Sequence, residues 1–183
     1  MNTAATTEKS TWNIDPAHSV AEFKVRHMMI SNVKGRFTTI SGSLHLDEAK
    51  IENSTIEASI EAASIATGDT QRDAHLKSPD FFDVENFPAL SFKSTAVRRL
   101  SADELKVDGD LTIHGVTLPA TFTVEGPTAA AKDPWGNLRV GISATTKINR
   151  KDFGLTWNAA LETGGILVGE EINISLEVQF IKA

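Results

Sequence analysis

The sequence contains no cysteine among its 183 residues. Disulfide bonds, thiolate catalysis, iron–sulfur ligation and anchoring through a diacylated cysteine are therefore excluded. Basic residues are also scarce, because 18 lysines and arginines stand against 24 aspartates and glutamates, which gives a net charge of −6. Binding to the phosphate backbone of a nucleic acid requires clustered lysine and arginine. We therefore expect no nucleic-acid partner.

Long apolar runs are missing as well. No stretch approaches the roughly 20 apolar residues of a membrane-spanning helix, so we expect no transmembrane segment. Residues 1–11 are small and polar, without the basic start and apolar run of a signal peptide or an anchor. We expect a disordered tail at 1–11, one domain at 12–183, and a cytoplasmic location.

Alternating apolar and polar residues predict strands through most of the chain. At 19–27, for example, Ala21, Phe23 and Val25 share one face. The strand at 33–46 needs a bulge at Thr38-Thr39 to keep its apolar residues on one side. The predicted strands are 19–27, 33–46, 55–61, 90–95, 105–113, 120–124, 138–144 and 172–180.

These strands predict an all-β fold, an eight-stranded antiparallel barrel of the lipocalin type, because closure leaves no strand edge unpaired. A barrel of this size is either filled by its own side chains or holds one small ligand. Small residues on the inward face favour a lumen; they are Ala21, Gly42, Ala58, Gly109 and Ala144.

One short helix, about residues 70–78, interrupts the strand pattern. Asp69 and Thr70 can cap its first turn, and Pro79 prevents its continuation. A helix of about two turns is marginal alone in water and needs tertiary packing. We expect that packing from Ala74, Leu76 and the pair Phe81-Phe82, and we interpret the segment as a lid over one end of the barrel.

The five histidines are too widely spaced to predict a zinc site, so we expect no metal. The strand phase points His27 inward, where two interpretations are equally supported. It is either a core histidine bonded to a backbone carbonyl or a polar contact for a ligand head group.

Three polar clusters have catalytic residue types but lack catalytic patterns. Asp15, His18 and Ser19 have no Gly-x-Ser-x-Gly elbow, so we interpret them as a structural turn. Residues 164–169 have the glycine spacing of a phosphate loop, but two glutamates follow where lysine and serine or threonine are needed. Residues 72, 73 and 75 most simply form ion pairs that tether the helix. Trp157 is either a core aromatic or part of the barrel mouth.

Several segments, in order, resemble the YceI-like, polyisoprenoid-binding family over Trp12 to about Phe180. They are Trp12–Ser19, Phe23–Met28, Val33–Phe37, Arg72–Leu76 with Asp80–Asp83, Gly109–Thr117 and Arg150–Leu155. The resemblance implies an extended lipocalin-like barrel that encloses a long isoprenoid or comparable lipid, and it implies binding without catalysis. Many family members carry a signal peptide and act in the periplasm, which makes the periplasm the alternative location.

The sequence therefore predicts a non-catalytic protein that binds, stores or transports a long-chain isoprenoid, such as a polyprenyl or isoprenoid-quinone lipid, and needs no cofactor. The alternatives are an enzyme acting on a prenylated substrate, with His27 or His75 as the acid–base group, and a filled scaffold barrel. The oligomeric state is open, a homodimer included. The predicted lumen residues are Phe23, Val25, His27, Phe37, Ile40, Leu76, Phe81, Phe82, Phe92, Ile113, Phe122, Ile142 and Leu176.

Overall fold

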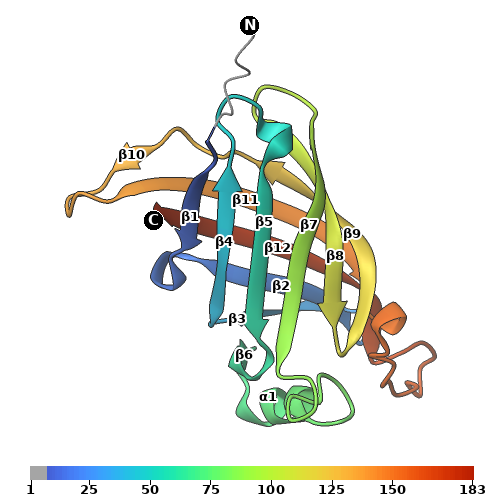
Figure 1. The fold of residues 1–183 in the computed structure, drawn as a ribbon. Coiled ribbons are helices and arrows are strands. Elements are labelled where there is room, and N and C mark those ends of the chain that lie inside the picture. Colours follow the sequence, from blue (N-terminus) through green and yellow to red (C-terminus); the bar gives the residue numbers. More distant parts are fainter. Residues whose placement is uncertain (1–7) are drawn as a thin grey trace, which may run out of the picture.

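The structure is a computed structural model that describes residues 8–183, and its strands wrap into a closed antiparallel β-barrel (Figure 1). The strands are β1 (Ser10–Ile14), β2 (Val20–His27), β3 (Ser31–Phe37), β4 (Ile40–Leu46), β5 (Thr55–Glu61), β6 (Ile65–Ala66), β7 (Ala89–Arg99), β8 (Glu104–Ile113), β9 (Val116–Glu125), β10 (Ala131–Lys132), β11 (Leu138–Asn149) and β12 (Val168–Lys182). The helices are α1 (Thr70–Lys77) and four 3-10 turns, η1 (Pro16–His18), η2 (Ile51–Asn53), η3 (Ala62–Ser64) and η4 (Arg150–Phe153).

The predicted eight-stranded barrel is confirmed, although three of its strands are interrupted, between β1 and β2, β3 and β4, and β5 and β6. Strands β1 and β2 follow one another along β12, β1 against its last residues and β2 against residues 168–177. Likewise, β4 pairs with β1 while β3 pairs with β2, and the break between β3 and β4 falls at the predicted bulge, Thr38-Thr39. Each broken pair therefore occupies one position in the barrel wall.

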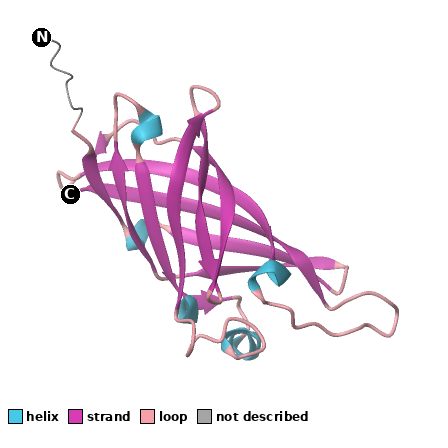
Figure 2. Cartoon of the chain, turned by 45° about the vertical axis from the view of Figure 1, so that its right-hand side comes forward, coloured by secondary structure: helices cyan, strands magenta, loops and turns pink. Residues whose placement is uncertain are grey.

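Pairing between β11 and β12 closes the barrel. Their register runs without a break from Arg139↔Ile181 to Asn149↔Glu171. Figure 2 shows the long strands crossing the barrel obliquely, with the short helices confined to its ends and loops. Closure gives the hydrogen-bonding groups of both strands partners within the barrel.

Alternation along each strand sends one set of side chains to the interior, as predicted. On β8 the buried residues are Leu105, Val107, Gly109, Leu111 and Ile113, while the residues between them are more exposed. The most deeply buried large side chains are Trp12, 1% exposed, and Phe180, 0% exposed.

Helix α1 begins and ends where its sequence predicts. Asp69 accepts hydrogen bonds from the backbone N–H groups of Gln71 and Arg72, at 2.9 and 3.0 Å. The expected packing of Ala74 is wrong, because its side chain is exposed. A polar tether also holds the helix, since the Asp73 carboxylate accepts bonds from the backbone N–H and the hydroxyl of Thr67, at 2.9 and 2.6 Å.

The N-terminal boundary differs from the expectation. Ser10 and Thr11 already pair with β4, so the ordered barrel begins before Trp12. Residues 1–7, most of the predicted tail, lie outside the described residues. Among residues 8–183, no helix combines the length and the apolar composition needed to cross a bilayer.

Candidate functional site: an apolar lumen in two parts

The interior of the barrel contains a cavity of about 160 Å³ at the end covered by α1, which we name the lid cavity. Its wall is built from the inward residues of the strands together with Leu76, Phe81 and Phe82 from the lid segment. All but two of the predicted lumen residues line it: Phe23, Val25, Phe37, Ile40, Leu76, Phe81, Phe82, Phe92, Ile113, Phe122 and Leu176. Their contact with a ligand stays a prediction.

A second cavity of about 100 Å³, the far cavity, is also lined by inward residues of the strands. Ile142 lines this cavity and not the first. Phe92 and Phe122 line both cavities, and their rings meet nearly edge to face with centroids 5.0 Å apart. We call this pair the aromatic waist, because it stands between the two parts of the lumen. Ala58 also lines both cavities.

The small inward residues do not all leave open space. A Cβ atom on Gly109 would collide with the ring of Phe92, and one on Gly35 would collide with the ring of Phe23. Neighbouring aromatic rings therefore occupy the space beside these two glycines. Ala21 lines the lid cavity and Ala144 the far cavity, so the expectation holds for the alanines. It is wrong for Gly109 and for Gly42, where a Cβ would collide with the backbone of β5.

Aromatic contacts hold the lid segment on the barrel. The ring of Phe82 packs edge-on against Phe37, with centroids 5.7 Å apart. Phe81 lies 5.3 Å from Trp157, and the His75 ring lies 4.7 Å from the same indole. Trp157 therefore belongs to the mouth of the barrel rather than to its core.

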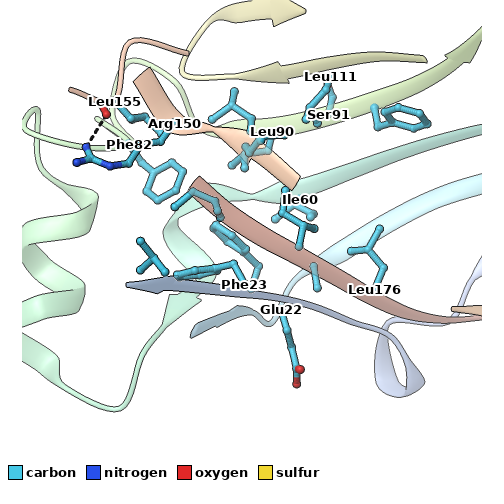
Figure 3. Close-up of a pocket in the computed structure, with 18 of the residues that line it drawn as sticks. Glu22, Phe23, Ile60, Phe82, Leu90, Ser91, Leu111, Arg150, Leu155 and Leu176 are labelled. Atoms are coloured by element: carbon cyan, nitrogen blue, oxygen red, sulfur yellow. Dashed lines mark hydrogen bonds between the residues drawn. The ribbon is translucent and has the colours of Figure 1, made fainter. Parts of the chain in front are cut away.

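Arg150 is the buried charged group in the wall of the lid cavity, with 3% of the residue exposed. Figure 3 shows its guanidinium at one end of the group of lining side chains, bonded to the carbonyl of Leu155. It donates four hydrogen bonds to backbone oxygens: Leu155 at 2.6 Å, Gly169 at 2.8 Å, Trp157 at 2.9 Å and Val168 at 3.1 Å. Burial lowers the pKa of Arg150 from its usual value, although an arginine stays protonated in proteins.

Two histidines were predicted to carry polar chemistry. His27 lines neither cavity and lies at the end of β2, paired in register with Ser31 and Val168. Strand β2 keeps an unbroken register with β3 as far as His27, so its alternation is intact. His27 is the last residue of the strand and lies outside the cavity wall. His75 bonds to the Asp80 carboxylate at 2.8 Å, and the nearby Ser78 hydroxyl donates to the backbone oxygen of His75 rather than to its ring.

The hydrogen bonds of Asp15, His18 and Ser19 are those of a structural turn and not those of a catalytic triad. The Asp15 carboxylate accepts bonds from Arg139 at 2.6 Å and contacts His18 at 2.7 Å, whereas the Ser19 hydroxyl donates to the backbone oxygen of Gln179. The bonds from Arg139 and His18 lower the pKa of Asp15 to about 2. Within residues 8–183, no three histidine, aspartate or glutamate side chains gather as metal ligands would.

These features define a class of protein: a closed antiparallel barrel of lipocalin-like architecture with an apolar interior. The profile of the YceI-like domain matches residues 12–180. The chain belongs to the YceI-like family.

Similar proteins agree with this assignment. A UPF0312 protein of Staphylococcus aureus (strain N315) is 37% identical, over 92% of this chain and 96% of its own. A UPF0312 protein of Pseudomonas savastanoi pv. phaseolicola is 41% identical, over 75% of this chain and 71% of its own. The crystal structure of the Campylobacter jejuni YCEI protein is 31% identical with a TM-score of 0.72, covering 87% of this chain and 91% of that one.

Two more distant structures show the same fold. Burkholderia cenocepacia BcnA is 23% identical with a TM-score of 0.77, covering 91% of this chain and 98% of its own. A polyisoprenoid binding domain from Saccharophagus degradans is 16% identical with a TM-score of 0.67, covering 94% of this chain and 98% of its own. At these identities the likeness concerns the fold alone.

Proposed function

We propose that this protein binds and carries a long-chain isoprenoid, or a comparable lipid, in the barrel lumen without catalysing a reaction. The observation that carries the proposal is the apolar wall of the lid cavity. Its polar residues are Glu22, Ser91 and Arg150. Figure 3 shows the Glu22 carboxylate directed away from the other lining side chains, and Arg150 is bonded to backbone oxygens. Burial of an apolar chain against such a wall is favourable by about 25 cal/mol per Å².

The volume of the lumen bears on how a long chain fits. A cavity of about 150 Å³ lined by aliphatic and aromatic residues holds one benzene molecule. The lid cavity is of that size, so it accommodates roughly one five-carbon isoprene unit as it stands. A long chain must therefore extend past the aromatic waist into the far cavity and displace side chains on the way.

A binding role fits the composition of the wall better than an enzymatic one. No histidine lines either cavity, and the described polar groups of the lid cavity form no nucleophile–base pair. One protein of the same fold is named a polyisoprenoid binding domain, which supports an isoprenoid as the ligand class. The cytoplasmic location and the oligomeric state stay predictions.

The test is to purify the protein from its own host and identify what comes with it. Native mass spectrometry should show a bound species, and organic extraction should release a lipid whose homologues differ by one isoprene unit. Extraction of no apolar molecule from a correctly folded barrel, or of a hydrophilic ligand instead, would contradict the proposal.

A further inference from the structure

The turn between β2 and β3 has an unusual sequence for its geometry. The amide of Ile30 donates to the carbonyl of His27 at 3.1 Å, and the two residues between them both have positive φ, 50° at Met28 and 60° at Met29. Such a type I′ turn favours Asn-Gly, because a side chain at positive φ is strained. Two methionines therefore occupy a turn that would be more stable with other residues.

The same turn exposes apolar side chains to solvent. Met28 is 41%, Met29 59% and Ile30 72% exposed. Ile166, 36% exposed, lies on the neighbouring loop between η4 and β12, where a Cβ on Gly165 would overlap the Met29 sulfur. We name Met28, Met29, Ile30 and Ile166 the apolar tip. Strain and apolar exposure at one place point to a function other than stability.

The apolar tip is continuous with the wall of the lid cavity. The amide of Met28 donates to the carbonyl of Leu167 at 2.7 Å, at the start of β12. Val25 and Val168, on the same two strands, line the lid cavity. At about 3.3 Å per residue, the tip lies roughly 10 Å beyond Val25. In Figure 1 the orange-red loop that carries Ile166 projects from the barrel after η4.

We propose that the apolar tip docks the barrel on the surface of a lipid bilayer, with the lid cavity facing the membrane. This inference rests on the proposed function, because a carrier of an apolar chain must collect it from a membrane without exposing it to water. The surrounding charges favour an apolar contact over an electrostatic one. The protein has a net charge of −6. Beside the tip, Arg26 donates to the carbonyl of Met29 at 3.3 Å, and Lys151 is paired with Glu170 at 2.8 Å. Docking therefore depends little on salt or on anionic lipid.

The experiment replaces the turn by its preferred sequence, Met28→Asn with Met29→Gly. This variant removes two apolar side chains and relieves the strain, so its denaturant midpoint should equal or exceed that of the unchanged protein. Binding of a fluorescent isoprenoid analogue added from ethanol should be unchanged. Co-sedimentation with phosphatidylcholine vesicles, and transfer of the analogue between vesicles, should each fall roughly tenfold. Adding phosphatidylglycerol or salt should alter neither protein's binding by a comparable factor.

A matched control exists at the other end of the barrel. Trp135 is 79% exposed and precedes β11, whose first residues pair with the last residues of β12. The tip lies beside the first residues of β12, where His27 pairs with Val168, so the two sites are separated by most of that strand. Trp135→Ser should leave vesicle binding unchanged.

Each other outcome overturns the proposal. Full vesicle binding by the Asn-Gly variant, or its loss in Trp135→Ser, would place the docking surface elsewhere. Self-association that only the Asn-Gly variant loses, with unchanged vesicle binding, would make a second copy the occupant of the tip. A protein that binds the analogue but no vesicles would refute docking alone. A protein that binds no analogue would refute the carrier function itself.

Discussion

The ring of Phe92 on β7 meets the ring of Phe122 on β9 across β8, with centroids 5.0 Å apart and planes at 74°. In register, Phe92 pairs with Leu111 and Phe122 with Val107, so Gly109 lies midway between them on the same face of β8. Because glycine has no side chain there, the two rings can meet over it. The waist of the lumen is thus a product of one glycine and two phenylalanines on three adjacent strands.

Replacing Phe92 by alanine should join the two cavities. Truncating a packed phenylalanine costs about 3–5 kcal/mol, so the protein without ligand should unfold at a lower denaturant concentration. A long isoprenoid can fill the vacated volume, so preference should shift toward longer chains. Denaturant midpoints and affinities measured with isoprenoids of increasing length check this. Phe153→Ala is the matched control, because Phe153 is buried but lines neither cavity; an equal shift in that variant would show that the waist does not limit the chain.

Replacing Ala58 by phenylalanine should obstruct the lumen where its two parts meet. The added ring overpacks the interior at a cost of about 1–3 kcal/mol, so the barrel should stay folded while analogue binding falls at least tenfold. Circular dichroism and fluorescence titration check the two parts separately. Ser59→Phe places the same ring on the opposite face of β5 and should bind normally. Undiminished binding by a folded Ala58→Phe protein would show that the ligand lies elsewhere.

Removing the apolar contacts of the lid, by Leu76→Ala with Phe81→Ala, should speed ligand release. Truncating Leu to Ala costs about 2–5 kcal/mol in a core, and the lower end is expected where a mobile lipid can fill the gap. Release should accelerate about tenfold for each 1.4 kcal/mol of lost contact with the bound chain. Stopped-flow release of a fluorescent isoprenoid, with denaturant midpoints of loaded and empty protein, measures both effects. Ala74→Ser on the exposed face of α1 is the control; equal destabilisation of both forms with unchanged release would mean that α1 is no lid.

Lowering the pH should reduce the stability of the fold through protonation of Asp15. Its pKa is about 2 because it accepts bonds from Arg139 and His18, whereas an unfolded aspartate has a pKa near 3.9. A carboxyl with a lowered folded pKa stabilises the fold above its unfolded pKa and loses that contribution as the pH falls through the folded value. Urea midpoints should therefore fall between about pH 5 and about pH 2.

Arg139→Met should flatten this dependence, because Arg139 also bonds the Asp133 carboxylate at 2.8 Å. Burial opposes ionisation of Asp133, but the bonds from Arg139 and Asn137 outweigh it and lower its pKa to about 2. Arg98→Gln, which breaks the exposed pair with Asp108, should change the slope less. An unchanged slope in Arg139→Met would exclude this cluster as the acid-sensitive element.

Much of the barrel is readable in the sequence because alternation is a local property. The inward phase of β8, and of Phe23 and Val25 on β2, follows from period two alone. Helix α1 could also be predicted from the sequence, since the side chains of Asp69 and Pro79 mark its two ends. The division of the lumen into two cavities could not be predicted from the sequence, because the position of Ile142 in the far cavity depends on how strands distant in sequence face one another.

Two features of the site could not be predicted from the sequence, for specific physical reasons. Arg150 bonds only to backbone oxygens, and every residue supplies such an oxygen, so no residue pattern indicates the contact. His27 was predicted to line the lumen from the phase of β2, but phase indicates only the face of a strand, and His27 is the last residue of β2 and lies outside the wall of either cavity. Gly109 illustrates a third limit, because a small residue can as easily admit a neighbouring ring as a ligand.

The four bonds of Arg150 join the two ends of the loop that runs from Leu155 to Val168. Because this guanidinium contacts main-chain oxygens, its four bonds do not depend on which side chains the loop carries. One loop side chain, Asn158, adds two bonds to the backbone of Val168 at the base of the loop. The middle of the loop, around Glu162 and Thr163, is exposed and can therefore change in sequence or accept an inserted peptide while its base stays closed. In evolutionary and engineering terms, this makes the loop a place where the barrel can gain a new outer surface and keep the same interior.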